Sequence, residues 1–178
     1  YQFESFASNY PRSEKVQEAA YLGAKCYSML SPVYSLDQVD TIKDIKKLQN
    51  FKETNPNSKY MPESNKTMRV LNDKKKKKVY ENAIGYNTIM DYKSALIALD
   101  LFIADYPGTA LKEKALYYKL DSAYHLAINS VPEKMEERLQ VAKLAYTTLI
   151  RYKADTEYKE KADAMLAKIE TDLQKFTK

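Results

Sequence analysis

The stretch YKSALIALDLFIADYPGT at residues 92–109 indicates the fold class of the whole chain. Its apolar residues recur at intervals of three and four, so they lie on one face of an amphipathic helix. They are Tyr92, Ala95, Leu96, Leu99, Phe102, Ile103 and Tyr106. Pro107 and Gly108 end this helix, and Thr109 is placed to cap the next one. A helix with one apolar face needs neighbouring helices to cover it.

The punctuation that ends this stretch recurs along the chain. It reads YPRS at 10–13, NPNS at 55–58 and YPGT at 106–109, with a weaker form, YKADT, at 152–156. Its interval of 45 to 51 residues indicates an array of helical repeats. We predict an all-α fold, a solenoid of antiparallel helix pairs forming a single domain over 1–178. The expected repeats are roughly 13–56, 58–107 and 109–154, followed by a tail helix at 157–176.

Apolar periodicity predicts seven or eight helices, and no strand pattern competes with them. Their expected ranges are 1–10, 14–30, from about Asp37 to before Pro56, 58–90, 92–106, 110–130, 132–153 and 157–176. The segment 58–90 is the longest. No glycine or proline stands between Glu63 and Ile84, so we expect this helix to be continuous or only kinked.

Five consecutive lysines, Lys74 to Lys78, stand in the middle of that long helix. At about 100° per residue they point all round the helix axis, so we expect them to be exposed on all sides. The simplest interpretation is a solvated junction between two packed ends. The alternative is attraction to acidic lipid headgroups or to an acidic partner. Nucleic acid is not expected as a partner, because no aromatic ladder interleaves with the lysines.

The composition narrows the class of protein. The net charge of +5 comes from acids and bases that are interspersed almost everywhere. No apolar run approaches the ~18 residues of a membrane-spanning helix, and no signal peptide is present. The single cysteine, Cys26, excludes an intramolecular disulfide and is expected to be a small packed residue. The chain opens inside a helical pattern, so we expect it to be a piece of a longer protein.

Signatures of catalysis are absent from the sequence. There is one histidine, no glycine-rich phosphate loop, and no cysteine or histidine pair at metal-ligand spacing. We therefore expect no enzymatic activity, no cofactor and no metal. The acids Glu133, Glu136 and Glu137 lie in the first turns of a helix, where they interact favourably with its dipole.

The block 79–107 resembles a tetratricopeptide repeat. Such repeats place a small residue where the paired helices approach most closely and large residues around it. The small residues here are Ala83 and Ala95, and the large ones are Tyr86, Leu99 and Phe102. The resemblance implies a stack of helix pairs with a groove for a partner.

Two other blocks depart from this pattern at one position each. In 117–154, Asp121 stands where a small residue is usual, and in 14–56 Asp44 replaces the expected alanine. These departures leave the prediction of paired helices in place, but they argue against a fully regular repeat geometry.

Several phrases, in the same order and spacing, resemble the C-terminal part of the BamD family. They are NPNSKY (55–60), MRVLNDKKKKKVYENAIGYN (68–87), YKSALIALDLFIADYPGT (92–109) and ALYYKLDSAYHLAINS (115–130). SPVYSLDQVDT (31–41) with LQNFKETNPNS (48–58) resembles the Bacteroidetes form of that family. BamD is the lipoprotein subunit of the bacterial outer-membrane β-barrel assembly machine.

The resemblance implies a non-enzymatic scaffold on the periplasmic face of the outer membrane. Its lipid anchor, an N-terminal cysteine, is not in this chain, because Cys26 follows no signal segment. The N-terminal repeats, which the family is thought to use for unfolded outer-membrane proteins, are expected to be missing as well. The implied partner of the C-terminal repeats is the periplasmic part of the barrel subunit. The alternative is a generic tetratricopeptide adaptor that clamps an extended peptide, in the periplasm or the cytosol.

The candidate partner-binding residues combine bulk with a polar end. Tyrosine and arginine are enriched at binding hot spots for this reason. The candidates, which we expect to be exposed, are Tyr117, Tyr118 and His125 on the helix 110–130, and Arg138 and Arg151 on the helix 132–153. By the repeat register, His125 shares the groove-lining face of its helix with Tyr118 and Ser122.

Overall fold

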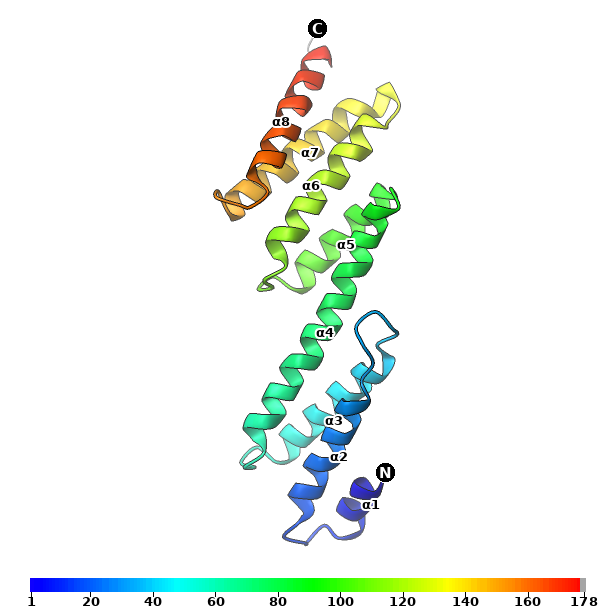
Figure 1. The fold of residues 1–178 in the computed structure, drawn as a ribbon, viewed down its shortest axis with the longest axis vertical. Helices are drawn as coiled ribbons and strands as arrows, with labels where there is room; N and C mark the ends of the chain where they lie inside the picture. Colours follow the sequence, from blue (N-terminus) through cyan, green and yellow to red (C-terminus); the bar gives the residue numbers. More distant parts are fainter. Residues whose placement is uncertain (177–178) are drawn as a thin grey trace. The chain divides into compact units, whose positions relative to one another are not determined.

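The computed structural model describes residues 1–176, and these contain eight α-helices, one short 3₁₀ helix and no strand. The helices are α1 (Gln2–Asn9), α2 (Val16–Leu30), α3 (Val39–Thr54), α4 (Met61–Thr88), α5 (Tyr92–Asp105), α6 (Lys112–Ile128), α7 (Pro132–Tyr152) and α8 (Lys159–Leu173), followed by η1 (Gln174–Phe176). Figure 1 shows these helices along the chain. The all-α prediction is confirmed, and the predicted ranges agree with the helices to within a few residues.

The chain divides into two compact units, Tyr1–Lys78 and Val79–Lys178, which we call the N-terminal and C-terminal units. Helix α4 contributes residues to the core of each. In the N-terminal unit, Met68 and Leu71 of α4 pack with apolar residues of α2 and α3. In the C-terminal unit, Tyr80 and Ala83 of α4 pack with residues of α5 and α6. The prediction that 58–90 forms one continuous helix is confirmed for Met61–Thr88.

Four of the connections between helices fold into one type of turn. In each, a serine or threonine hydroxyl accepts a hydrogen bond of 3.2–3.3 Å from the backbone N–H two residues later. Side chains of this kind commonly stabilise such turns. The hydroxyls belong to Ser13, Ser58, Thr109 and Thr156, which stand between α1 and α2, α3 and α4, α5 and α6, and α7 and α8. The predicted punctuation, including the weak form at 152–156, therefore corresponds to a recurring local structure.

The residue that ends the helix before three of these turns has nearly the same backbone conformation. Its φ and ψ are −126° and 61° at Tyr10, −132° and 58° at Asn55, and −127° and 59° at Tyr106. Lys153, at the fourth turn, differs, with φ −153° and ψ 104°. The fourth turn is also the one without proline, which restricts the conformation of the residue that precedes it.

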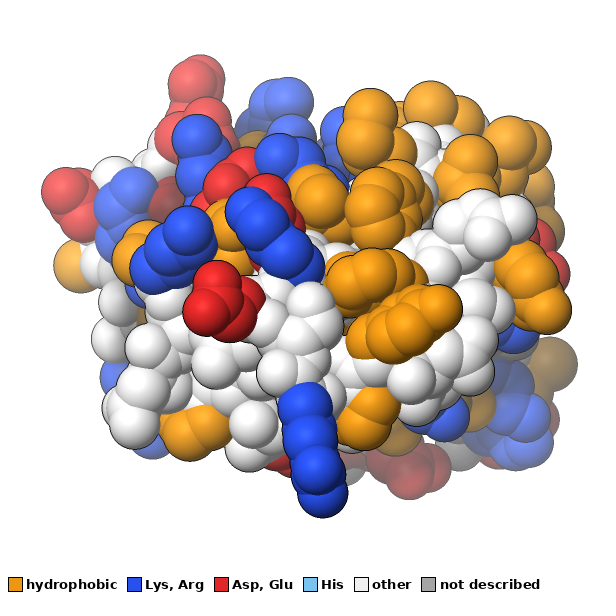
Figure 2. Space-filling view, turned by 90° about the horizontal axis from the view of Figure 1, so that it is seen from below, with side chains coloured by type: hydrophobic (Ala, Val, Ile, Leu, Met, Phe, Trp, Pro, Cys, Tyr) orange, Lys and Arg blue, Asp and Glu red, His pale blue; other side chains and the backbone are white. Residues whose placement is uncertain are grey.

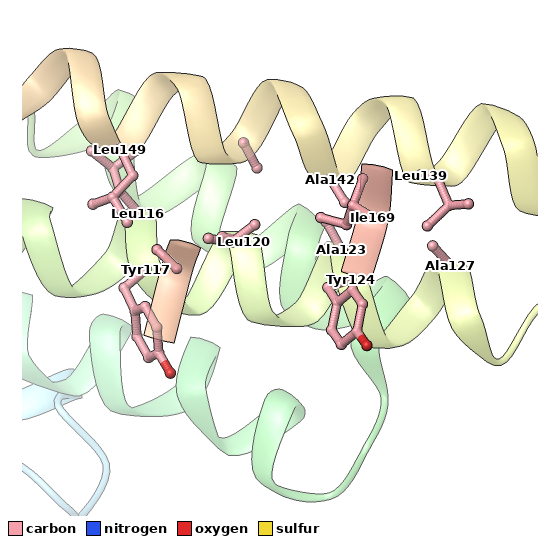
Figure 3. Packing of buried hydrophobic residues seen from close by; sticks show 12 residues of the cluster. Leu116, Tyr117, Leu120, Ala123, Tyr124, Ala127, Leu139, Ala142, Leu149 and Ile169 are labelled. Carbon is pink, nitrogen blue, oxygen red and sulfur yellow. The ribbon is translucent and has the colours of Figure 1, made fainter. Parts of the chain in front are cut away.

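The largest core lies in the C-terminal unit, between α6, α7 and α8. Figure 3 shows the side chains of α6 and α7 interleaving, with Ile169 of α8 beside them. Several of these side chains are fully buried, among them Leu120, Ala127, Leu139, Ala142, Leu149 and Ile169. Within each helix their spacing of three or seven residues is the periodicity from which the helices were predicted. Tyr86, predicted to fill space in the core, is instead 41% exposed.

The lysine run is not exposed on all sides, contrary to the prediction. The Lys74 Nζ donates to the Ser31 hydroxyl at 2.8 Å, and the Lys78 Nζ donates to the Ser35 carbonyl at 2.7 Å. Only Lys77 is classed as exposed. The reason is that the α2–α3 connection lies beside this part of α4 (Figure 1), and the long lysine stems reach its backbone.

Cys26 is exposed, so the prediction of a packed cysteine is wrong. Helix α2 buries Ala19, Tyr21, Gly23 and Ala24. Cys26 lies two turns after Ala19 at nearly the same angle round the helix, toward the end of α2 where Met29 and Leu30 are also exposed.

Candidate partner-binding surface

Tyr117 lies in the core of the C-terminal unit and is only 9% exposed, so the prediction that it is exposed is wrong. Its ring stacks on that of Tyr158, with 4.2 Å between centroids and 14° between planes. Burial raises the pKa of the Tyr117 hydroxyl. The stacking partner stands in the segment that leads into α8, 41 residues further along the chain. Tyr117 therefore joins α6 to that segment and is not available to a partner.

Tyr118 and His125 share one face of α6, since seven residues bring a helix back to nearly the same direction. Both are partly exposed. The His125 ring stacks on Tyr92, at the start of α5, with 5.3 Å between centroids, and meets Tyr124 edge-on at the same separation. The imidazole is thereby held between two aromatic rings with 37% of its side chain exposed. It presents a fixed polar edge to solvent.

A hydrogen-bond network that sequence reasoning missed positions this face. The Asn87 Nδ2 of α4 donates to the Asp121 Oδ2 at 2.8 Å and lies 2.9 Å from the Ser122 hydroxyl oxygen. The other Asp121 oxygen lies 3.6 Å from the His125 Nε2. Asp121, which departs from the small residue usual in the repeat, is therefore an acceptor between two helices. The sequence did contain a signal for this contact: Asn87 and Asp121 are 34 residues apart, which is the common length of one repeat.

Arg138 and Arg151 do not form one patch. They stand 13 residues apart near the two ends of α7, which corresponds to about 20 Å along the helix and roughly 140° around it. Arg138 is partly buried, and its guanidinium donates to the Ser130 hydroxyl at the α6–α7 turn. Arg151 is exposed in the last turn of α7. The predicted candidates thus divide into the Tyr118–His125 face of α6 and two separate arginines.

The C-terminal unit also presents exposed aliphatic side chains that were not among the candidates. Ile97 and Leu101, four residues apart on α5, are 58% and 59% exposed. Val141 and Leu144, three residues apart on α7, are 45% and 67% exposed. Spacings of three and four place each pair on one face of its helix, away from the buried side chains. Each pair adds apolar contact area of the kind found at the centre of interfaces.

A polar contact fixes the end of α6 that lies farthest from His125. The Glu113 carboxylate accepts hydrogen bonds from the Thr156 hydroxyl at 2.6 Å, the Lys153 Nζ at 2.9 Å and the Glu157 N–H at 3.2 Å. The hydrogen bond from Thr156, and then that from Lys153, lower the pKa of Glu113. This carboxylate ties the start of α6 to the turn between α7 and α8.

The N-terminal unit carries an apolar groove between α1 and α2. Its volume is about 620 Å³, and Phe3, Phe6, Tyr10, Ala19 and Leu22 contribute to its lining. Figure 2 views this end of the molecule and shows hydrophobic side chains gathered on the side where α1 lies. The groove has few charged groups, so it offers a surface for apolar contacts.

Among residues 1–176, no three histidine, cysteine or acidic side chains come together in a way that could hold a metal ion. Over the same residues, no helix has the length and apolar character needed to cross a bilayer. The exposed or partly exposed side chains described above in the C-terminal unit are aromatic, basic and aliphatic. No protein-family model and no curated protein matches this chain.

Proposed function

We propose that this chain is a non-enzymatic scaffold of the outer-membrane β-barrel assembly machinery, similar to BamD. In this proposal the C-terminal unit binds the periplasmic domains of the barrel subunit. The protein acts at the periplasmic face of the outer membrane, with its lipid anchor and the repeats for unfolded barrel proteins outside residues 1–178.

The observation that best supports a repeat scaffold is the recurring serine or threonine turn. It stands at Ser13, Ser58, Thr109 and Thr156, after every second helix of the chain. Repeated units of this kind stack through nearest neighbours and leave long faces for partners. The collinear phrases of the sequence favour the assembly-machine family among repeat proteins.

The Tyr118–His125 face and Arg151 are the best candidates for contacts with the barrel subunit. Tyr118 and His125 are held in place by aromatic neighbours, so little side-chain entropy is lost on binding. Arg151 is exposed and offers a planar cation for a carboxylate of the partner. Arg138 is committed in part to Ser130, and we expect it to contribute less.

A pull-down of the barrel subunit's periplasmic domains by the chain tests the proposal. We expect the unmodified chain to capture the domains and Arg151→Glu to weaken capture several-fold, with a smaller effect of Arg138→Glu. Arg12→Glu, an exposed arginine in the N-terminal unit, is the control of matched charge. Failure of the unmodified chain to bind, or equal effects of Arg151→Glu and Arg12→Glu, would contradict this assignment.

A generic peptide adaptor is the second candidate. The observation that favours it is the partly exposed His125, which stacks on Tyr92 and lies beside Asp121. A clamp for extended peptides needs polar side chains of this kind on a rigid face. Peptides selected for binding to the chain should then lose affinity on His125→Ala. If they bind the variant as well as the unmodified chain, this face does not recognise them.

A further inference from the structure

The connection between α2 and α3 exposes apolar side chains and buries polar ones, the reverse of an ordinary surface loop. Its apolar side chains project outward, with Val33 62% and Leu36 58% exposed. Met29 and Leu30, in the last turn of α2, are 77% and 74% exposed, and Val39 at the start of α3 is 51% exposed. Scattered single exposed residues need no explanation, whereas a gathering of this kind marks an interaction site.

Polar side chains hold this loop from the inside. Gln38 is 7% exposed. Its side-chain amide nitrogen, Nε2, donates to the Val33 carbonyl at 2.9 Å and to the Leu36 carbonyl at 3.0 Å. The Thr41 hydroxyl, fully buried, donates to the Gln38 Oε1 at 2.8 Å and lies 2.7 Å from the Ser31 hydroxyl oxygen. The outward direction of Val33 and Leu36 is therefore fixed by a satisfied network beneath them.

The lysine run of α4 borders the same loop. Lys74 and Lys78 donate to its backbone at Ser31 and Ser35. The Lys77 ammonium lies 4.0 Å from the centroid of the Tyr34 ring. Contacts between the α2–α3 loop and α4, 43 residues apart in the chain, thus bring the lysines next to the projecting aliphatic side chains.

Acidic neighbours offset only part of this charge. Asp73 pairs with Lys76 at 2.7 Å, and Asp40 pairs with Lys43 at 3.1 Å. The Asp37 carboxylate, at the end of the loop, accepts the Val39 N–H at 3.0 Å. Within residues 1–176, the other four lysines of the run form no ion pair at 4.0 Å or less; they are Lys74, Lys75, Lys77 and Lys78.

We propose that this surface, formed by Met29, Leu30, Val33, Leu36, Lys74, Lys77 and Lys78, binds the headgroup region of an anionic lipid bilayer. The aliphatic side chains enter the interface, and the lysines attract the anionic headgroups, which together give reversible peripheral binding. The surface lies wholly in the N-terminal unit and is distinct from the candidate partner-binding residues of the C-terminal unit.

The shape of the surface favours a bilayer over a peptide. A peptide in extended or helical form is usually received by a groove, whereas Val33 and Leu36 protrude from a loop. A bilayer interface accepts protruding aliphatic side chains without a complementary shape. Lysine, which is depleted at protein interfaces, is suited to the diffuse negative potential of anionic lipids.

Co-sedimentation of the full chain with lipid vesicles tests the proposal. The vesicles contain phosphatidylcholine alone, or phosphatidylcholine and phosphatidylglycerol in equal parts. We expect binding to the anionic vesicles only, weakened at high salt because screening shortens the range of the attraction. Lys77→Glu with Lys78→Glu should weaken binding roughly tenfold or more. Val33→Ser with Leu36→Ser should weaken it roughly tenfold through lost apolar insertion.

The control of matched charge is Lys114→Glu with Lys168→Glu, two exposed lysines of the C-terminal unit. Circular dichroism checks that each variant keeps its helices. The proposal is overturned if anionic vesicles do not bind the chain or if the control weakens binding as much as the test pair. It is also overturned if Val33→Ser with Leu36→Ser changes nothing while polyglutamate binds as tightly as the vesicles, because the lysines would then serve an acidic polymer.

Discussion

Asp44 in the N-terminal unit and Asp121 in the C-terminal unit stand where the repeat pattern expects a small residue, yet their surroundings differ. Asp44 lies on the buried stripe of α3 at 2% exposure, and its Oδ2 has no hydrogen-bond partner. Asp121 keeps 18% of its side chain exposed and accepts from Asn87 of α4. One carboxylate is buried with an oxygen that has no hydrogen-bond partner, and the other joins two helices.

The difference shows how one departure from a repeat pattern can have opposite energetic consequences. Burial, followed by the nearby charge of Asp40, raises the pKa of Asp44. An unpaired buried carboxylate costs free energy, whereas a paired one near the surface contributes modestly. The N-terminal unit therefore contains a destabilising position that the C-terminal unit avoids through Asn87.

The largest effect is expected from Asp44→Ala, which we predict to stabilise the protein by about 2 kcal/mol. Because the folded-state pKa of Asp44 is raised, its cost appears as the pH rises past the unfolded-state value and is absent in acid. The gain measured by urea denaturation should therefore shrink as the pH is lowered toward that value. A variant less stable than the unmodified protein at neutral pH would mean that the carboxylate has an unseen partner.

The opposite case is Glu113, a carboxylate with three donors. Glu113→Ala should destabilise the protein by about 1.5 kcal/mol, because Thr156 is buried and loses its acceptor. The pKa of Glu113 is lowered, so its contribution is present above the unfolded-state pKa and is lost as the pH falls through the folded-state value. Glu160→Ala, an exposed glutamate of α8, is the control and should have little effect in the same denaturation experiment.

Asp121→Ala makes the same substitution as Asp44→Ala and should have the opposite sign. Removing the acceptor of Asn87 is expected to destabilise by about 1 kcal/mol, since the Ser122 hydroxyl remains as a neighbour of the amide. The measurement is the midpoint of thermal unfolding. If Asp44→Ala and Asp121→Ala shift this midpoint in the same direction, the proposed difference between the two aspartates is wrong.

The smallest expected effect is at the α4–α5 turn. Met90 has a φ of 65°, and its N–H and that of Asp91 donate to the Asn87 and Tyr86 carbonyls, the Schellman arrangement in which glycine is preferred. Met90→Gly should stabilise by about 0.5 kcal/mol, because the 73% exposed side chain contributes little packing. Ile89→Gly, one residue earlier and not at positive φ, should destabilise instead. Differential scanning calorimetry of the pair decides between these outcomes.

The helices could be predicted from the sequence because their determinants are local. The helix expected at 92–106 is α5, Tyr92–Asp105, since both its apolar face and its terminators lie within those residues. The four turns could be predicted for the same reason, because each depends on a hydroxyl and a backbone N–H only two residues apart.

The contacts between helices could not be predicted in this way. The burial of Tyr117 depends on Tyr158, and the surroundings of Lys74 and Lys78 depend on a loop more than 40 residues earlier. Such contacts follow from the angles at which helices pack, and these vary between repeats. The candidate residues therefore lie on the helices that the sequence predicted, whereas the burial of Tyr117 differs from the prediction.

Hydrogen exchange of the chain, alone and saturated with the periplasmic domains of the barrel subunit, tests the proposed scaffold function most directly. We predict slower exchange in α6 and in the last turns of α7, around Tyr118, His125 and Arg151, with little change at residues 29–39. Unchanged exchange in α6 and α7 at saturation, or protection confined to the N-terminal unit, would contradict the proposal.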